Sequence, residues 1–406
     1  MNLKKQFSLI FAISFSALMT ASEVMSYKLY GFVRNDLYVN SRQNIEALDG
    51  ILNIFPRPIE MHQGADKNAQ PNSQMIAIST RLGLDLKGKD FLNAKTSAKI
   101  ECDFAGVGAQ YFLIRLRQAY TKLNWEKTEL LVGQTWHPLF NAAQPLTPSM
   151  SVGAPFQPFN RSPQIRLTQQ LGQSFQFTTA AAYQMQFLTQ GPSGASAWYM
   201  KNGLLPSLFS GIEYKNPRLN VGFAFDGKSL LIDRVRFSSG AAMVYTKYQN
   251  KKFQFAAKSI LGQNMSEYIM LGGYGVSGER TYNQDYKLNT YSNFNTSSSW
   301  ISAAYGSTFQ MGFYAGLIQN LGTQKQLTPN NNGMFTVYGL GQNATNFVDR
   351  LLRFAPHAIY NFGNCRLSFE YEFTQALYGS VTASGRVSAP YAVSNHRLST
   401  SFSYIF

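Results

Sequence analysis

The chain has 406 residues and a formal net charge of +15, but only 14% of its residues are charged, against roughly 25% in soluble domains. It contains no apolar run of about 18 residues, which excludes a protein that spans membranes with helices. Aromatic residues reach 14% and are spread along the whole chain, which argues against disorder. A chain this poor in charge needs an apolar environment.

The first 26 residues differ from the rest of the chain. Lys4 and Lys5 precede an apolar stretch at residues 7–19, and small residues follow at Ala21 and Ser22. This order is typical of a secretory signal peptide. We therefore expect residues 1–26 to be removed on export and residues 27–406 to form the mature chain.

The mature chain repeats one pattern, in which apolar and polar residues alternate. Between residues 75 and 87, for example, Ile76, Leu82 and Leu84 alternate with Arg81 and Asp85. A period of two is typical of β-strands with one apolar and one polar face. Phase changes near Gln118 indicate a β-bulge. Sixteen segments show the pattern, namely residues 27–40, 75–87, 94–104, 111–125, 129–137, 163–171, 174–187, 205–215, 218–228, 236–248, 252–262, 296–305, 308–320, 347–361, 366–378 and 393–406.

The connections between these segments alternate between short and long. Short ones carry Gly, Asn or Pro, which favour tight turns, and long ones include residues 41–74, 138–162 and 263–295. This alternation predicts an all-β, antiparallel, up-and-down barrel of about sixteen strands with both termini on the turn side. Two uncertain segments, at 129–137 and 296–305, and an unassigned stretch near 269–276 leave fourteen or eighteen strands open.

Alternation alone also fits a secreted β-sandwich whose apolar rows face an inner core. The signal peptide and strands of ten or more residues favour a transmembrane barrel, in which apolar rows face lipid and polar rows enclose water. Aromatic residues at the strand ends, as expected of a membrane-interface girdle, support the same choice. They are Trp125, Phe175, Tyr214, Tyr248, Phe253, Tyr305, Phe309, Tyr360 and Phe362.

The last predicted strand ends on an aromatic residue. Phe402, Tyr404 and Phe406 occupy every second position up to the end of the chain. This ending resembles the signal by which the barrel-assembly machinery recognises bacterial outer-membrane barrels. The alternative is an ordinary edge strand that stops at the chain end.

Several strand motifs resemble a known family, the trimeric porins of Gram-negative outer membranes, and within it most closely the DcaP-like and phosphate-selective group. The resemblance implies a homotrimeric, sixteen-stranded pore in outer-membrane lipid, whose third long loop folds into the lumen. The long first loop, residues 41–73, departs from the pattern of the family and is given no role. The motifs are Tyr30-Gly31-Phe32-Val33-Arg34-Asn35-Asp36, Lys99-Ile100-Glu101-Cys102-Asp103-Phe104, Leu116-Arg117-Gln118-Ala119-Tyr120, Gly133-Gln134-Thr135-Trp136 and Arg161-Ser162-Pro163-Gln164-Ile165-Arg166.

The third loop, residues 138–162, is rich in proline and carries one charge, Arg161. Such a composition favours a stiff, compact segment. Folded inward, the loop would narrow the channel; the alternative is an external proline-rich loop. Its candidate constriction residues are Pro138, Phe140, Pro145, Pro148, Pro155, Phe156 and Phe159.

The strand phases place more bases than acids on the inner face, which predicts a preference for anions. Pairing of bases with acids, such as Arg34 with Asp36 or Lys99 with Glu101, would leave a weakly selective pore instead. The candidate anion-guiding residues are Arg34, Arg81, Lys99, Arg115, Arg117, Arg166 and Arg353. The acids expected in the lumen are Asp36, Asp85, Glu101, Asp103, Glu370 and Glu372.

Motifs of enzymes and metal sites are weak or missing in the sequence. It has no HExxH or GxSxG motif, and a GxGxxG spelling at residues 273–278 lies between strands and opens no helix. We therefore expect no enzyme, no cofactor, no metal and no disulfide between Cys102 and Cys365. The bases are not clustered with stacking aromatics, so no nucleic-acid partner is expected.

Three functions remain open from the sequence. The first is a porin for passive diffusion of small hydrophilic solutes, favouring anions such as carboxylates or phosphate. The second is a structural or adhesive surface barrel whose loops at 41–74 and 263–295 bind a partner. The third is a barrel hydrolase, because a catalytic triad assembles in space and spacing does not exclude it.

Overall fold

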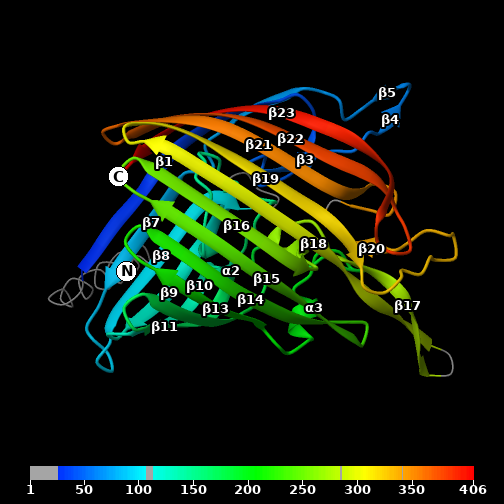
Figure 1. Ribbon diagram of the computed structural model, residues 1–406, viewed down its shortest axis with the longest axis horizontal. Coiled ribbons are helices and arrows are strands. Elements are labelled where there is room, and N and C mark those ends of the chain that lie inside the picture. The colour runs from blue at the N-terminus through cyan, green and yellow to red at the C-terminus, as the bar shows by residue number, and fades with distance from the viewer. Residues whose placement is uncertain (1–25, 107–112, 284–285, 341) are drawn as a thin grey trace, which may run out of the picture.

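The structure, a computed structural model, describes residues 26–106, 113–283, 286–340 and 342–406. It is a closed antiparallel barrel of sixteen strands (Figure 1), in which each barrel strand pairs with the next one along the chain. The predicted fold class and strand count are confirmed. The strands are β1 (Ser26–Asn40), β7 (Arg81–Lys87), β8 (Lys95–Gly106), β9 (Leu113–Asn124), β10 (Thr128–Trp136), β11 (Arg161–Leu171), β12 (Phe175–Ala182), β13 (Ser207–Lys215), β14 (Leu219–Ile232), β15 (Val235–Gln249), β16 (Phe253–Gln263), β18 (Tyr286–Gly306), β19 (Phe309–Thr323), β21 (Phe347–Phe362), β22 (Cys365–Val381) and β23 (Val387–Ile405).

Pairing of the first and last strands closes the barrel. The register of β1 with β23 runs from Phe32 opposite Ile405 to Asn40 opposite Arg397. Beyond it, the Gly31 and Phe406 backbones exchange two hydrogen bonds, of 3.0 and 3.1 Å. The start of β1 and the end of β23 therefore lie together at the end of the barrel where the tight turns are, as predicted.

The two faces of each strand have opposite character. On β23, Leu398 and Phe402 are exposed by 59% and 43%, whereas Ser401 and Ser403 on the inner face are nearly buried. Apolar side chains exposed on the outside of a closed sheet fit a hydrocarbon environment, since closure leaves the sheet without an unpaired edge strand. The inner face is polar.

The second predicted strand, residues 75–87, is interrupted in the structure. It consists of β6 (Asn72–Ile76) and β7, both of which pair with β1. At the break, the Thr80 hydroxyl accepts a hydrogen bond from the Arg34 amide, 3.1 Å long, in place of a backbone carbonyl. The phase shifts there, and Ile78, which the alternation placed toward lipid, is instead 7% exposed within the interior cluster.

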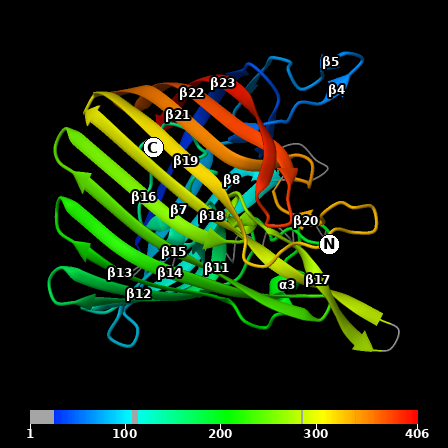
Figure 2. The same cartoon turned by 45° about the vertical axis from the view of Figure 1, so that its right-hand side comes forward.

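Two further strands depart from their predicted form, and a third keeps it. The segment predicted at 174–187 ends at Ala182, because the Gln184 side chain bonds both the amide and the hydroxyl of Thr189 and folds the chain into a loop. The segment predicted at 296–305 begins ten residues earlier, where β18 pairs with β17 (Tyr274–Asn283) in a hairpin beyond the barrel wall (Figure 2). The bulge predicted near Gln118 is confirmed, since Glu101 pairs with Gln118 but Cys102 pairs with Leu116.

The long loops carry short elements of their own. The remaining elements are β2 (Asn44–Ala47), β3 (Leu52–Pro56), β4 (Met61–His62), β5 (Ala65–Asp66), α2 (Pro138–Asn141), α3 (Trp198–Lys201), the short 3₁₀ turn η1 (Ser266–Tyr268) and β20 (Val337–Tyr338). No helix in the described ranges is both long and apolar enough to cross a membrane.

Cys102 and Cys365, on β8 and β22, are both free thiols, as predicted.

Candidate pore site

The third loop, which occupies residues 137–160 between β10 and β11, crosses the interior of the barrel. Its backbone bonds to strands on the opposite wall. The Ser302 hydroxyl on β18 accepts a hydrogen bond from the Leu146 amide, 2.9 Å, and donates one to the Leu146 carbonyl, 3.1 Å. Farther along, the Tyr314 hydroxyl on β19 donates to the Gly153 carbonyl, 3.1 Å. The predicted inward fold of this loop is confirmed.

Aromatic residues of the third loop pack into a core inside the barrel. Phe140, Phe156 and Phe159 are each exposed by 3% or less. Phe140 stacks on Trp136 at a centroid distance of 3.9 Å, and Phe156 lies edge-on to Tyr314. Of the prolines expected in a constriction, Pro138 begins α2, Pro155 is buried, and Pro145 and Pro148 line the hollow described below.

The third loop begins at a buried histidine. The His137 Nδ1 accepts a hydrogen bond from the Leu139 amide, 3.3 Å, and caps α2. Its Nε2 lies 3.6 Å from a carboxylate oxygen of Asp226 on β14. Burial lowers the pKa of His137 to about 3, and the positive charges of Lys228 and Arg166 act in the same direction. His137 is therefore neutral near pH 7.

Arg353, expected to guide anions, instead fastens the loops to the wall. Its guanidinium donates hydrogen bonds of 2.8 to 2.9 Å to the carbonyls of Ala154, Asn53 and Ile54 and to the Thr374 hydroxyl. The side chain is 1% exposed. Two predicted lumen acids also bind the inward loops. Glu370 accepts a hydrogen bond from Thr147 of the third loop, and Glu372 accepts one from Asn53 of the first loop.

A hollow of about 350 Å³ lies between the third loop, the first loop and the wall formed by the first strands and by β21 to β23. We call it the arginine hollow. Of its described lining residues one, Asp103, is acidic, and six are arginines: Arg34, Arg81, Arg115, Arg117, Arg161 and Arg366. Four of these six were predicted to line the pore.

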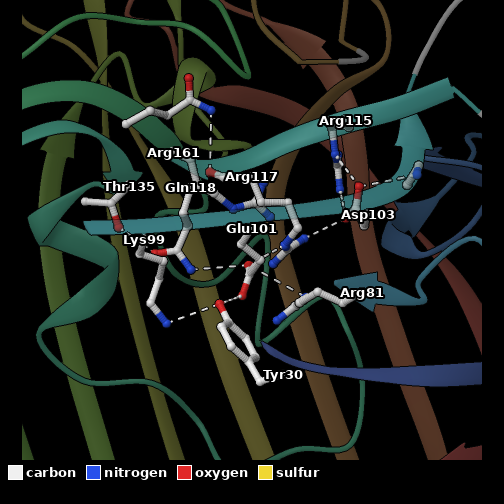
Figure 3. A network of polar contacts seen from close by, with 12 residues as sticks. Tyr30, Arg81, Lys99, Glu101, Asp103, Arg115, Arg117, Gln118, Thr135 and Arg161 are labelled. Carbon is white, nitrogen blue, oxygen red and sulfur yellow. Dashed lines mark hydrogen bonds and ion pairs between the residues drawn. The ribbon is translucent and has the colours of Figure 1, made fainter. Parts of the chain in front are cut away.

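Two carboxylates hold the arginine side chains in place (Figure 3). Arg115 donates two hydrogen bonds to the Asp103 carboxylate, of 3.0 and 2.6 Å. Arg117 donates to both carboxylates, 2.8 Å to Glu101 and 2.7 Å to Asp103. The bulge of β9 makes this possible, because it places Arg115 and Arg117 side by side opposite Asp103 and Glu101. Such charge-assisted, bidentate bonds orient the guanidinium planes.

The cluster still carries more positive than negative charge. Arg81 lies 3.7 Å from Glu101, so three guanidinium groups share two carboxylates, and Arg161 adds a fourth that pairs with neither. Arg161 bonds the neutral Gln186 at 2.8 Å and lies over the Trp136 ring at 4.2 Å. Buried nitrogen atoms of Arg81, Arg115 and Arg161 have no hydrogen-bond partner. Guanidinium groups with unused donors, beside a hollow of about 350 Å³, are suited to an anion.

The other predicted lumen charges lie apart from this cluster or are neutralised. Arg34 forms the expected pair with Asp36, at 2.7 Å. Lys99 pairs with Asp85 at 2.9 Å, not with Glu101 as considered from the sequence, and bonds the Tyr30 hydroxyl, which itself donates to Glu101. Arg166 lines a second hollow, of about 570 Å³, on the other side of the third loop.

Two arginines of the hollow were missed by the strand phases. Arg161 follows a loop and packs on Trp136, its partner across β10 and β11, so its position depends on the loop. Arg366 shares the inward row of Ser368 and Glu370, and this spacing could have identified it.

Within the described residues, no three His, Cys, Asp or Glu side chains are placed to hold a metal ion.

A closed sixteen-stranded barrel with an inward third loop and a charged lumen is the fold of outer-membrane porins. Comparisons with solved structures agree. The outer-membrane channel DcaP of Acinetobacter baumannii superposes with a TM-score of 0.67 at 18% identity, over 95% of this chain and 98% of that one. An anion-selective porin from Comamonas acidovorans gives 0.55 at 10% identity, over 94% and 100%.

The trimer form of OmpT, an outer-membrane protein of Vibrio cholerae, gives a TM-score of 0.53 at 9% identity, over 95% of this chain and 100% of that one. No protein-family model and no curated protein sequence matches the chain. The resemblance to outer-membrane porins inferred from the strand motifs is confirmed at the level of the fold.

Proposed function

We propose that the mature chain is a porin of a Gram-negative outer membrane, through which small hydrophilic solutes diffuse passively, with a preference for anions such as carboxylates and phosphate. On this proposal residues 1–26 direct export and are removed, the barrel-assembly machinery inserts the chain into outer-membrane lipid, and the working form is a homotrimer.

The surplus of guanidinium groups in the arginine hollow carries this proposal. Like charges along a narrow passage with low-dielectric walls raise the local concentration of ions of opposite sign. Four guanidinium groups face two carboxylates there, and some of their donors are unpaired. The arginine fork also matches the geometry of carboxylate and phosphate oxygens.

The neighbours support the same function by analogy. One is an outer-membrane channel, one is an anion-selective porin, and one is an outer-membrane protein in trimer form. Each shares the barrel over nearly its whole length with this chain.

The reversal potential of the full mature chain in a planar bilayer, under a gradient of KCl, tests the proposal. We expect chloride to be more permeant than potassium. The variant Arg81→Gln, Arg366→Gln should reduce that preference severalfold, whereas Arg166→Gln, in the other hollow, should change it less. A preference for potassium in the unmodified protein would refute the anion preference. Failure to conduct would favour the adhesive barrel or the hydrolase, since neither needs an open lumen.

A further inference from the structure

The first loop places a second segment inside the barrel. Its β2–β3 hairpin, residues 44–56, turns at Asp49-Gly50, where φ is 51° and 76° and the Ile51 amide bonds the Leu48 carbonyl at 3.1 Å. Leu48 is left-handed as well, with φ of 57°. Asp49 and Gly50, with this hydrogen bond, have the φ signs of a type I′ turn, the tight connection preferred in short hairpins. The tip is therefore a defined structure and not a loose loop.

Side chains from three neighbouring strands hold the hairpin in place. Besides Arg353 and Glu372, the Tyr378 hydroxyl donates to the Pro56 carbonyl at 2.7 Å, and Arg397 donates to the Gly50 carbonyl at 2.8 Å. All four side chains belong to the inner face of β21, β22 and β23 and are buried. Buried polar side chains that bond a loop backbone at several points fix its position, because each broken bond would leave a buried group unpaired.

The fixed hairpin presents apolar side chains to the arginine hollow. Leu48, Ile51 and Leu52 line it from the first loop, and Met150 and Val152 line it from the third loop. We call these five residues the apolar ledge. Leu48 and the two third-loop residues are partly exposed, while Ile51 and Leu52 pack beneath them in the interior core. Arginine side chains and apolar side chains thus line the same hollow.

We propose that the β2–β3 hairpin determines specificity, so that the hollow favours carboxylates with an aromatic or branched aliphatic body over small anions of the same charge. This inference rests on the proposed channel function. The carboxylate of the larger anion binds the guanidinium groups, and its apolar body covers the apolar ledge. When a small anion binds, the ledge stays in contact with water. Removal of apolar surface from water favours the larger anion.

Block of the chloride current in planar bilayers tests the inference, with sodium benzoate and sodium acetate as probes. Both are monovalent carboxylates and differ in the apolar body. With the full mature chain, benzoate should block at a concentration roughly tenfold lower than acetate, as expected when a pocket recognises added hydrocarbon. Equal block by both probes would overturn the proposal.

The variant Leu48→Asn, Ile51→Thr removes apolar surface while keeping the backbone, since Asn tolerates the left-handed conformation of residue 48. It should abolish most of the discrimination between benzoate and acetate and leave the preference for chloride over potassium unchanged. Ile45→Thr, on the same hairpin but outside the hollow, is the matched control. An equal loss in the control would overturn the assignment to the ledge. If the unmodified protein showed no preference for chloride over potassium, the proposed anion preference itself would be refuted.

Discussion

The Lys258 ammonium group on β16 donates a hydrogen bond of 2.8 Å to the carbonyl oxygen of Leu139, near the start of the third loop. It also donates to the Phe140 carbonyl and the Gln157 side chain, at 3.2 and 3.3 Å. The residue is 2% exposed, and no carboxylate lies within ion-pair distance of it among the described residues. A cation buried in this way fastens the start and the end of the third loop to the wall.

Replacement of this lysine should loosen the third loop. Lys258→Met leaves two buried carbonyls without a donor, at a cost of about 1–3 kcal/mol each. We expect a larger and noisier single-channel conductance and an earlier thermal unfolding in detergent. Lys247→Met removes another inward lysine that makes no loop contact and serves as control. Unchanged conductance and stability in Lys258→Met would show that Lys258 does not hold the loop.

The lumen acids should limit the anion preference of the channel. Asp103→Asn keeps the shape of the side chain but removes the charge that Arg115 and Arg117 share. We expect the chloride-to-potassium permeability ratio, measured from the reversal potential, to rise at least about twofold, since the local field becomes more positive. Asp85→Asn, whose charge pairs with Lys99 outside the arginine hollow, should have a smaller effect. A lower ratio in Asp103→Asn would argue against ion selection at this cluster.

The buried His137 should make the folded barrel less stable in mild acid. Its pKa is about 3 in the folded state and about 6.5 in an unfolded chain. Between these values the unfolded chain binds a proton that the folded chain excludes, so stability falls as pH falls below about 6.5.

Urea unfolding of the refolded barrel in detergent, at pH 7 and at pH 5, measures this contribution. His137→Asn keeps a capping side chain and should remove about 2 kcal/mol of the pH-dependent loss. His62→Asn, at an exposed position on β4, is the control. An identical loss in the wild type and in His137→Asn would contradict the buried neutral histidine.

The terminal aromatic residue should matter more for assembly than for stability. The Phe406 backbone pairs with Gly31, and its side chain is 43% exposed on the outer face. Phe406→Ala keeps the backbone pairing, so refolding in detergent should be nearly normal while the amount of folded barrel in cells falls severalfold. Heat-modifiable mobility of membrane fractions reports the folded amount. Phe362→Ala, another exposed aromatic at the turn end, should not reduce it.

Much of the barrel could be predicted because alternation is a local property. Rows such as Leu398, Phe402 and Tyr404 determine which face meets lipid, and the turn residues between strands determine how many strands there are. The exception at Ile78 has a local cause that the alternation does not show, since the Thr80 side chain replaces a backbone acceptor opposite Arg34.

The candidate site could be predicted only in part. The alternation of the strands placed Arg34, Arg81, Arg115 and Arg117 on the inner face. It did not show which carboxylates they pair with, because cross-strand neighbours depend on register and on the exact place of the bulge.

The sequence by itself determined the strands, their two faces and the excess of positive charge inside. Only the tertiary structure decided which charges remain available. Arg353 bonds Asn53, about 300 positions earlier in the chain, and Lys258 bonds Leu139, about 120 positions earlier. Such contacts exist because closure of the barrel brings distant strands and two inward loops into one confined space, where every buried backbone carbonyl needs a donor.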